Sequence, residues 1–182
     1  MQHLEKEKDS LLARLVSGEH SAANELVDAY YRQIYLFMRR MGHNRQTSED
    51  LTQDCFLRAW NHIDQLRNTR ALSSWIYSIS ANISRSYWRR HRRDENFDDF
   101  KLDLADAQKN GAQQAEQLEQ LKRLLSAVEK LPVKLRETVV LHYMQKLSIA
   151  EASEAAGVME GTFKSRLNKA LKILKKQMVL EI

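Results

Sequence analysis

The chain has 182 residues, in which lysine and arginine outnumber aspartate and glutamate by 29 to 24, giving a formal net charge of +5. One proline, five glycines and long runs of leucine, alanine, glutamine, arginine and lysine predict an all-α fold. No apolar run reaches membrane-spanning length and no export signal follows the charged N-terminus, which argues against membrane insertion or secretion. The single cysteine, Cys55, allows no internal disulfide, so a reducing, cytoplasmic setting is expected.

The charge is distributed unevenly along the chain. Residues 1–93 hold 15 basic and 10 acidic side chains, residues 94–114 hold 2 and 6, and residues 115–182 hold 12 and 8. Two basic blocks, with net charges of +5 and +4, therefore flank an acidic segment of −4. This pattern predicts two small helical domains that bind polyanions and are joined by a linker.

Helix signals place four helices in each block. In the first block, Gly18 and Gly42 end amphipathic segments, and Thr47 with Asp50 resembles a capping box that starts the third helix. In the second block, Pro132 stands at a helix start and Gly157 at a turn between two helices. The expected helices span residues 6–17, 21–41, 48–63, 72–93, 115–130, 133–145, 148–156 and 160–178.

The segment between the blocks, residues 94–114, has weak periodicity and is interpreted as a tether. It nevertheless contains apolar residues that a fully solvated linker would not need, namely Phe97, Phe100, Leu102 and Leu104. We therefore expect these side chains to dock onto a partner or onto one of the domains.

The last helix has two chemically different faces. At 100° per residue, one arc of about 100° is apolar and contains Phe163, Leu167, Ala170, Leu171 and Leu174. The opposite face carries short polar and cationic side chains, namely Lys164, Ser165, Asn168, Lys169 and Lys172. Such a helix, preceded by a helix and a glycine turn, suits insertion into the DNA major groove. The alternative is an amphipathic surface helix whose lysines are merely solvated.

The third helix presents a compact acidic and amide face. Asp50, Gln53, Asp54 and Leu57 fall within about 100° of arc, opposite a side that includes Phe56 and Trp60. One interpretation is a solvated face whose acids favour the helix N-terminus. The other is a protein-docking surface with a charge opposite to that of the DNA-binding faces.

The fourth helix becomes strongly basic towards its end. Its last nine residues, numbered 85–93, contain five arginines interleaved with Tyr87 and Trp88, and the polar loop 67–70 precedes the helix. Arginine attracts phosphate and aromatic rings stack on unpaired bases, so this end predicts a nucleic-acid surface. The alternative is that Trp75 and Trp88 belong to the core and that the arginines solubilise a helix end.

The search for catalytic groups finds no phosphate-binding glycine loop and no histidines at metal-ligand spacing. Cys55 lies near the apolar side of its helix, where an inert buried thiol is expected. The sequence therefore predicts a protein that is not an enzyme and needs no cofactor or metal.

Three stretches resemble the extracytoplasmic-function (ECF) sigma factors of bacterial RNA polymerase. Residues 147–170 resemble the promoter-reading helix-turn-helix, with the run Gly-Thr-Phe-Lys-Ser-Arg-Leu at 161–167. Residues 49–60 resemble the polymerase-binding helix of the family, and residues 74–82 its promoter-melting helix. The three occur in the order and spacing of the family and together cover nearly the whole chain apart from the linker.

The resemblance implies an N-terminal four-helix sigma-2-type domain at 1–93, a linker at 94–114 and a C-terminal sigma-4-type helix-turn-helix domain at 115–182. It implies a factor that binds core RNA polymerase, directs it to a class of promoters and helps to melt the DNA. The implied partners are the clamp helices and flap of the polymerase, promoter DNA and an anti-sigma factor, often membrane-anchored. The free protein is expected to be a monomer, and Phe97 and Phe100 to help pack its domains when it is inhibited.

The resemblance also assigns roles to individual residues. The residues expected to bind core polymerase are Asp50, Gln53, Asp54 and Leu57. Those expected at the minus-ten element are Arg67, Asn68, Thr69, Arg70, Trp75, Asn82, Arg85, Arg89 and Arg90. Those expected at the minus-thirty-five element are Thr162, Lys164, Ser165, Arg166, Asn168 and Lys169, with Glu160 nearby expected to repel phosphate.

Two other classes of protein remain open on the residues alone. A stand-alone helix-turn-helix regulator would bind duplex DNA without polymerase, but it gives no reason for the acidic face around Asp50. A helical interaction protein would use its basic helices only for solubility and would not bind DNA at low salt.

Overall fold

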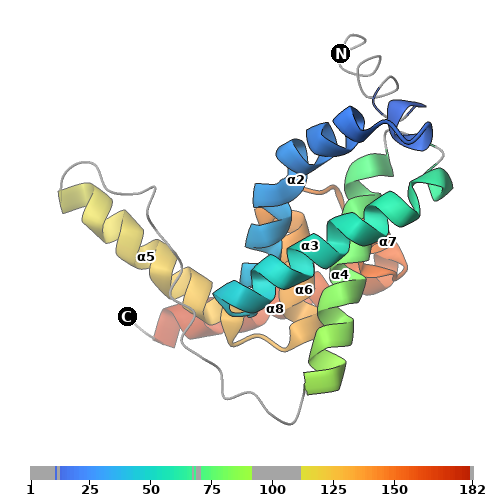
Figure 1. Ribbon diagram of the computed structural model, residues 1–182. Coiled ribbons are helices and arrows are strands. Elements are labelled where there is room, and N and C mark those ends of the chain that lie inside the picture. Colours follow the sequence, from blue (N-terminus) through green and yellow to red (C-terminus); the bar gives the residue numbers. More distant parts are fainter. Residues whose placement is uncertain (1–10, 12, 67, 69–70, 92–111, 181–182) are drawn as a thin grey trace.

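The computed structural model describes residues 11, 13–66, 68, 71–91 and 112–180, and these residues form a helical protein (Figure 1). Apolar residues at helical spacing in each segment account for this architecture. The helices are α2 (His20–Arg40), α3 (Arg45–Asn61), α4 (Leu72–His91), α5 (Ala112–Glu129), α6 (Val133–Val139), α7 (Ile149–Ala156) and α8 (Glu160–Leu180), with short 3₁₀ and π turns at η1 (Ile63–Gln65) and η3 (Val140–Met144).

The first domain is built from α2, α3 and α4, which pack on one another. Ile34, Phe37 and Met38 on α2 and Ile76 on α4 are fully buried between them. Helix α3 begins at Arg45, three residues before the predicted start, because the Asn44 side chain accepts a hydrogen bond from the Thr47 amide and caps the helix. The predicted cap at Thr47 is therefore wrong by one helical turn.

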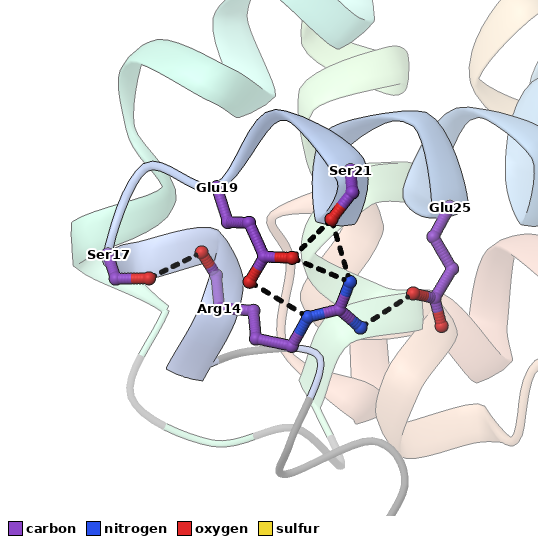
Figure 2. A network of polar contacts seen from close by, with 5 residues as sticks. All are labelled: Arg14, Ser17, Glu19, Ser21 and Glu25. Atoms are coloured by element: carbon purple, nitrogen blue, oxygen red, sulfur yellow. Dashed lines mark hydrogen bonds and ion pairs between the residues drawn. The ribbon is translucent and has the colours of Figure 1, made fainter.

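Residues 11 and 13–16 are helical and are joined to the start of α2 by a polar network around Arg14 (Figure 2). The Arg14 guanidinium donates to Glu19 at 3.0 Å, to Glu25 at 2.9 Å and to Ser21 at 2.9 Å. The three partners are exposed and Arg14 is partly exposed, so the network orients the segment and adds little stability. Burial of Leu15 against the first domain supplies the apolar contact.

The second domain consists of α5 to α8. Helix α6 continues into the π turn η3, where the expected single helix over 133–145 changes its winding. Helix α7 starts with a capping box between Ser148 and Glu151, a sequence signal that the helix prediction did not use. It ends at Gly157, whose φ of 67° is left-handed, as the predicted turn requires.

The two domains pack against each other mainly through α4 and α7. A single apolar cluster runs from Phe37 and Ile76 in the first domain to Leu141 and Phe163 in the second. Helix α5 contacts α8 and α6 and projects away from the rest of the protein (Figure 1). It begins at Ala112, three residues before the expected helix start at residue 115. The expected docking residues Phe97, Phe100, Leu102 and Leu104 lie outside the described residues.

Candidate functional site

The acidic face on α3, formed by Asp50, Gln53, Asp54 and Leu57, is open to solvent. Asp50 and Gln53 are exposed, and Leu57 leaves 64% of its surface accessible. Asp54 is half-buried and accepts two contacts of 2.9 Å from the Arg58 guanidinium one turn later. A partner cation that reaches Asp54 therefore has to share the carboxylate with Arg58, whereas Asp50, one turn earlier on the helix, is exposed.

An apolar hollow of about 380 Å³ opens beside the acidic face, between α2 and α3. Gln53 and Leu57 belong to both the hollow and the face, and Tyr31 stacks on Phe56 at a ring-centroid distance of 6.3 Å. The other lining residues are Ala23, Leu26, Val27 and Trp60. Sequence reasoning placed Phe56 and Trp60 opposite the acidic face, but both are half-buried and line the hollow beside Gln53. At 100° per residue, Trp60 falls only about 20° from Gln53 around the helix.

Asn82 and Arg85, two residues expected at the minus-ten element, are already engaged. Asn82 is exposed on α4, and its side-chain oxygen accepts a hydrogen bond from Arg85. The other end of the Arg85 guanidinium reaches the second domain, where it contacts the Glu137 carboxyl at 2.5 Å and the Ala156 carbonyl at 3.2 Å. In this arrangement of the domains Arg85 is paired with Glu137, and its expected role at the minus-ten element stays a prediction.

The aromatic residues at the end of α4 are packed among themselves. The Trp88 indole donates to the Met41 carbonyl at 3.2 Å and stacks on His43 at 5.0 Å, and Tyr87 stacks on His91 at 4.1 Å. His43 is buried and its Nε2 lies 2.8 Å from the Ser84 hydroxyl. Burial, with a smaller contribution from nearby Arg136, lowers the pKa of His43 to about 3. For Trp88 the core interpretation is therefore the better one.

The remaining minus-ten candidates divide into three groups. Arg89 and Arg90 are exposed at the end of α4, and Asn68 is exposed before it. Trp75 is half-buried and packs against both apolar clusters of the protein. The other three candidates, Arg67, Thr69 and Arg70, lie outside the described residues.

Helix α8 has the two faces that its sequence predicts. Phe163, Leu167, Ala170 and Leu174 are buried against the rest of the domain. The exposed side chains are those expected to read the minus-thirty-five element, namely Thr162, Lys164, Ser165, Asn168 and Lys169, whereas Arg166 is half-buried.

Two residues at the margins of α8 differ from expectation. Leu171, predicted to be buried, is 37% exposed, because it lies about 80° from Phe163 at the edge of the apolar arc. Glu160 was expected to repel phosphate, but its carboxylate pairs with Lys164 at 3.1 Å, which offsets its charge at the start of the helix.

Sequence reasoning missed the polar contact between the domains, which depends on two neighbours in α6. Arg136, 3% exposed, donates to the Met41 carbonyl of the first domain at 2.9 Å and to carbonyls of its own domain. It passes so close to Gly42, whose φ is 92°, that a Cβ there would collide with the guanidinium. Glu137, 1% exposed, accepts a hydrogen bond from Arg85 of the first domain.

Burial shapes the ionisation of Glu137. Loss of water raises the pKa of the Glu137 carboxyl to about 7, and the nearby cations Arg85, Arg166 and Lys134 only partly offset this rise.

Two more polar contacts join the domains: the Tyr77 hydroxyl donates to the Gln145 side chain at 2.7 Å, and Arg40 to the Met144 carbonyl at 3.3 Å.

Other chemical groups form no reactive arrangement in the described part of the chain. Cys55 is buried, lies 3.1 Å from the Ser80 hydroxyl, and has its pKa raised to about 12 by burial, as expected of an inert thiol. Among the described residues, no three histidine, cysteine, aspartate or glutamate side chains are grouped so that they can hold a metal ion. None of the described helices is long and apolar enough to cross a membrane.

Family models match both domains. Residues 26–94 match the model described as Sigma-70 region 2, and residues 121–174 match the model described as Sigma-70, region 4. The first match includes the acidic face on α3 and the whole of α4. The second includes α7 and the part of α8 up to residue 174.

Several curated proteins are similar over most of their length. The chain is 30% identical to the ECF RNA polymerase sigma factor SigM of Bacillus subtilis over 154 residues, covering 84% of this chain and 92% of the relative. It is 29% identical to SigW of the same organism, covering 92% and 94%. It is 31% identical to SigM of Mycobacterium tuberculosis, covering 91% and 82%.

Solved structures share the fold. CnrH, in complex with the cytosolic domain of CnrY, aligns with a TM-score of 0.72 at 24% identity, covering 94% of this chain and 97% of that one. RpoE of Bartonella quintana, in complex with the anti-sigma factor NepR, aligns with a TM-score of 0.69 at 22% identity, covering 87% and 98%.

Proposed function

The chain belongs to the ECF RNA polymerase sigma factors, and on that premise we propose which of its surfaces perform each step of promoter recognition. As an alternative sigma factor it directs core polymerase to a class of promoters and supports DNA melting. It is not an enzyme, because the bond-forming chemistry belongs to the polymerase. We place its action in the cytoplasm, where polymerase and chromosome meet.

The acidic face on α3 is the proposed contact with the clamp helices of the largest polymerase subunit. One observation carries this assignment: the Asp50 carboxylate and the Leu57 side chain are both exposed on the same face of α3. An exposed leucine flanked by acidic and amide groups is typical of a docking surface that meets a basic, partly apolar partner. The hollow lined by Tyr31 and Phe56 continues the apolar part of that surface.

The DNA contacts are proposed on two separate helices. On α8, Lys164, Ser165 and Lys169 face solvent on the side opposite the buried arc, as major-groove reading requires. On α4, Asn82 is proposed to hold an unstacked base of the minus-ten element together with residues 67–70, with Arg85, Arg89 and Arg90 on nearby phosphates. Holding a base outside the duplex offsets an unstacking cost of a few kcal/mol.

An anti-sigma factor is the proposed regulator. The solved structure of RpoE is a complex with an anti-sigma factor, and the fold of this chain matches it over 87% of the chain. We propose a comparable partner here, either membrane-anchored or soluble, that binds the free monomer and competes with polymerase.

The polymerase assignment is tested with Asp50→Lys. This substitution reverses an exposed charge, so helicity by circular dichroism is expected to persist while co-purification with core polymerase is lost. Glu119→Lys on α5, 65% exposed in its side chain, is a matched control that should leave association intact. Undiminished association of the Asp50 variant would refute the docking assignment. A stand-alone DNA-binding regulator, the alternative function, would associate with polymerase in neither form.

A further inference from the structure

The segment that precedes α2, residues 11 and 13–16, lies outside the match to Sigma-70 region 2, which begins at residue 26. Its leucines nevertheless belong to the core, since Leu15 is 1% exposed and Leu11 is 9% exposed. The two leucines are four residues apart and therefore share one face of the segment, whereas Val16 is 52% exposed. This leading segment is therefore a packed element of the first domain.

The leucines of the leading segment belong to an apolar cluster that holds both ends of the connection between η1 and α4. Leu66 follows η1 and Leu72 begins α4, and both are buried in this cluster. Between them lie residues 67–70, which are proposed at the minus-ten element and of which Asn68 is described. The leading segment therefore packs with the anchors of a proposed DNA-binding connection.

The described part of this connection turns directly into α4. The Ala71 amide donates to the Asn68 carbonyl at 3.0 Å. Trp75, one turn into α4, packs against the same apolar cluster. Asn82 comes seven residues after Trp75, so it falls on nearly the same face of the helix, about 10 Å further along. The position of Leu72 therefore sets where Asn68 and Trp75 lie relative to Asn82.

A polar network fixes how the leading segment meets α2 (Figure 2). The Arg14 guanidinium donates to three side chains at the start of α2, namely Glu19, Ser21 and Glu25. Because Arg14 precedes Leu15, these contacts fix the rotation of the segment that directs Leu15 into the cluster. Arg14 is partly exposed, so the network can be removed without opening a cavity in the core.

The connection between η1 and α4 needs such support if it helps to hold an unstacked base. A binding surface of this kind works when its groups are placed to within about 0.5 Å. The connection lies outside the regular helices, so the side chains that anchor its two ends decide its position. The alternative is that Leu11 and Leu15 contribute only to the stability of the first domain. The two roles differ in which backbone amides and which DNA contacts change when a leucine is removed.

We propose that Leu11 and Leu15 are positioning residues for the minus-ten surface. They hold the anchors Leu66 and Leu72 in place, and with them the side chain of Asn68. Both leucines are buried, so their effect on DNA is indirect. The inference deepens the proposed function and rests on it, whereas the packing of the segment is a property of the free chain and is tested without DNA.

Leu15→Ala in the free full-length chain tests the packing. Hydrogen exchange measured by NMR should show the Ala71 amide exchanging at least about tenfold faster than in the wild type, because the turn that it closes loses its support. The Met41 amide, which donates to the Phe37 carbonyl at 2.9 Å in the other apolar cluster, should change by less than about twofold. Leu174→Ala, the same substitution at a buried position of the second domain, should leave exchange at Ala71 unchanged.

Promoter DNA tests what the packing positions. The probe is a promoter duplex that the wild-type holoenzyme selects from a genomic library, with its single-base variants across the minus-ten element, and run-off transcription is the readout. Leu15→Ala should reduce discrimination among these variants at least about fivefold, the lower end of what one mismatched base pair costs. Discrimination at the minus-thirty-five element and association with core polymerase should stay unchanged. A uniform loss of transcription on all templates would mark a folding role alone and overturn the proposal.

Two further variants keep the result decisive. Leu15→Met conserves the side-chain volume and should retain wild-type exchange at Ala71 and wild-type discrimination. Arg14→Ala loosens the segment without a cavity, so it should change both measurements in the direction of Leu15→Ala, to a smaller extent. Wild-type exchange and discrimination in whichever of Arg14→Ala and Leu15→Ala folds would overturn the proposal.

The failure of the proposed function would look different. In that case no form of the protein, wild type included, would bind core polymerase or select a promoter. Exchange at Ala71 would then decide the packing step by itself: faster exchange in Leu15→Ala would support it, and unchanged exchange would refute it.

Discussion

Leu57 offers the sharpest quantitative test of the polymerase-binding surface. It keeps 64% of its surface exposed in the free chain. Fully burying a leucine side chain is worth about 1.5–3 kcal/mol, so covering the exposed part is worth about 1–2 kcal/mol. Leu57→Ala should therefore raise the Kd for core polymerase about fivefold to thirtyfold. Fluorescence anisotropy of labelled chain titrated with core enzyme measures this change.

This substitution should have little effect on the stability of the free protein. Because Leu57 contributes little to the core, its replacement should change the free energy of unfolding by less than about 0.5 kcal/mol. Leu121→Ala on α5, another exposed leucine at 43%, is the matched control and should leave polymerase affinity unchanged. The reasoning is wrong if Leu57→Ala binds like the wild type, or if both variants lose affinity equally.

Three more outcomes are expected. Lys169→Ala should weaken DNA binding and reduce the slope of log K against log salt by about one if the lysine contacts phosphate, whereas an effect at one base position would mark a base contact. Packing of the two domains against each other should weaken as pH rises from about 4.5 to 7 and then level off, by up to about 1.4 kcal/mol per pH unit, because only the packed form raises the pKa of the Glu137 carboxyl to about 7. Small-angle X-ray scattering between pH 5 and 8 measures this change, and Glu137→Gln should abolish it. Phe163→Ala, at a fully buried position, should cost about 3–5 kcal/mol in urea unfolding, and a loss below about 1 kcal/mol would contradict its core role.

Periodicity and turn residues predicted most of the fold. The apolar arc of α8 and the glycine turn at Gly157 are local features, set by residues within a few positions of one another, and the structure confirms them. The start of α3 was misjudged because Asn44 and Thr47 both offer a capping side chain, and the choice depends on how the preceding chain leaves α2. The pairs Asp54–Arg58 and Glu160–Lys164 follow from four-residue spacing and were within reach of the sequence.

The contacts across the domain interface were not predictable in this way. Arg85 and Glu137 are 52 residues apart, and Arg136 and Met41 are 95 apart, so no local period relates them. Composition pointed to arginine as a phosphate ligand, which is its commonest use in a basic helix end. Burial of Arg85 against a carboxyl of the other domain depends instead on the tertiary arrangement. Trp88 was ambiguous for the same reason, since its partner His43 lies across the helix bundle.

Gly42 makes the sequence of the first domain depend on the sequence of the second. Its missing side chain leaves room for Arg136, a residue 94 positions later that belongs to the other domain. Chimaeras that join the first half of one relative to the second half of another therefore face a compatibility rule: a second half that carries Arg136 needs a first half with glycine at 42, where the φ of 92° also favours glycine. Hybrids that keep Gly42 together with Arg136 should still pack their two domains against each other, whereas hybrids with a larger residue at 42 beside Arg136 should not.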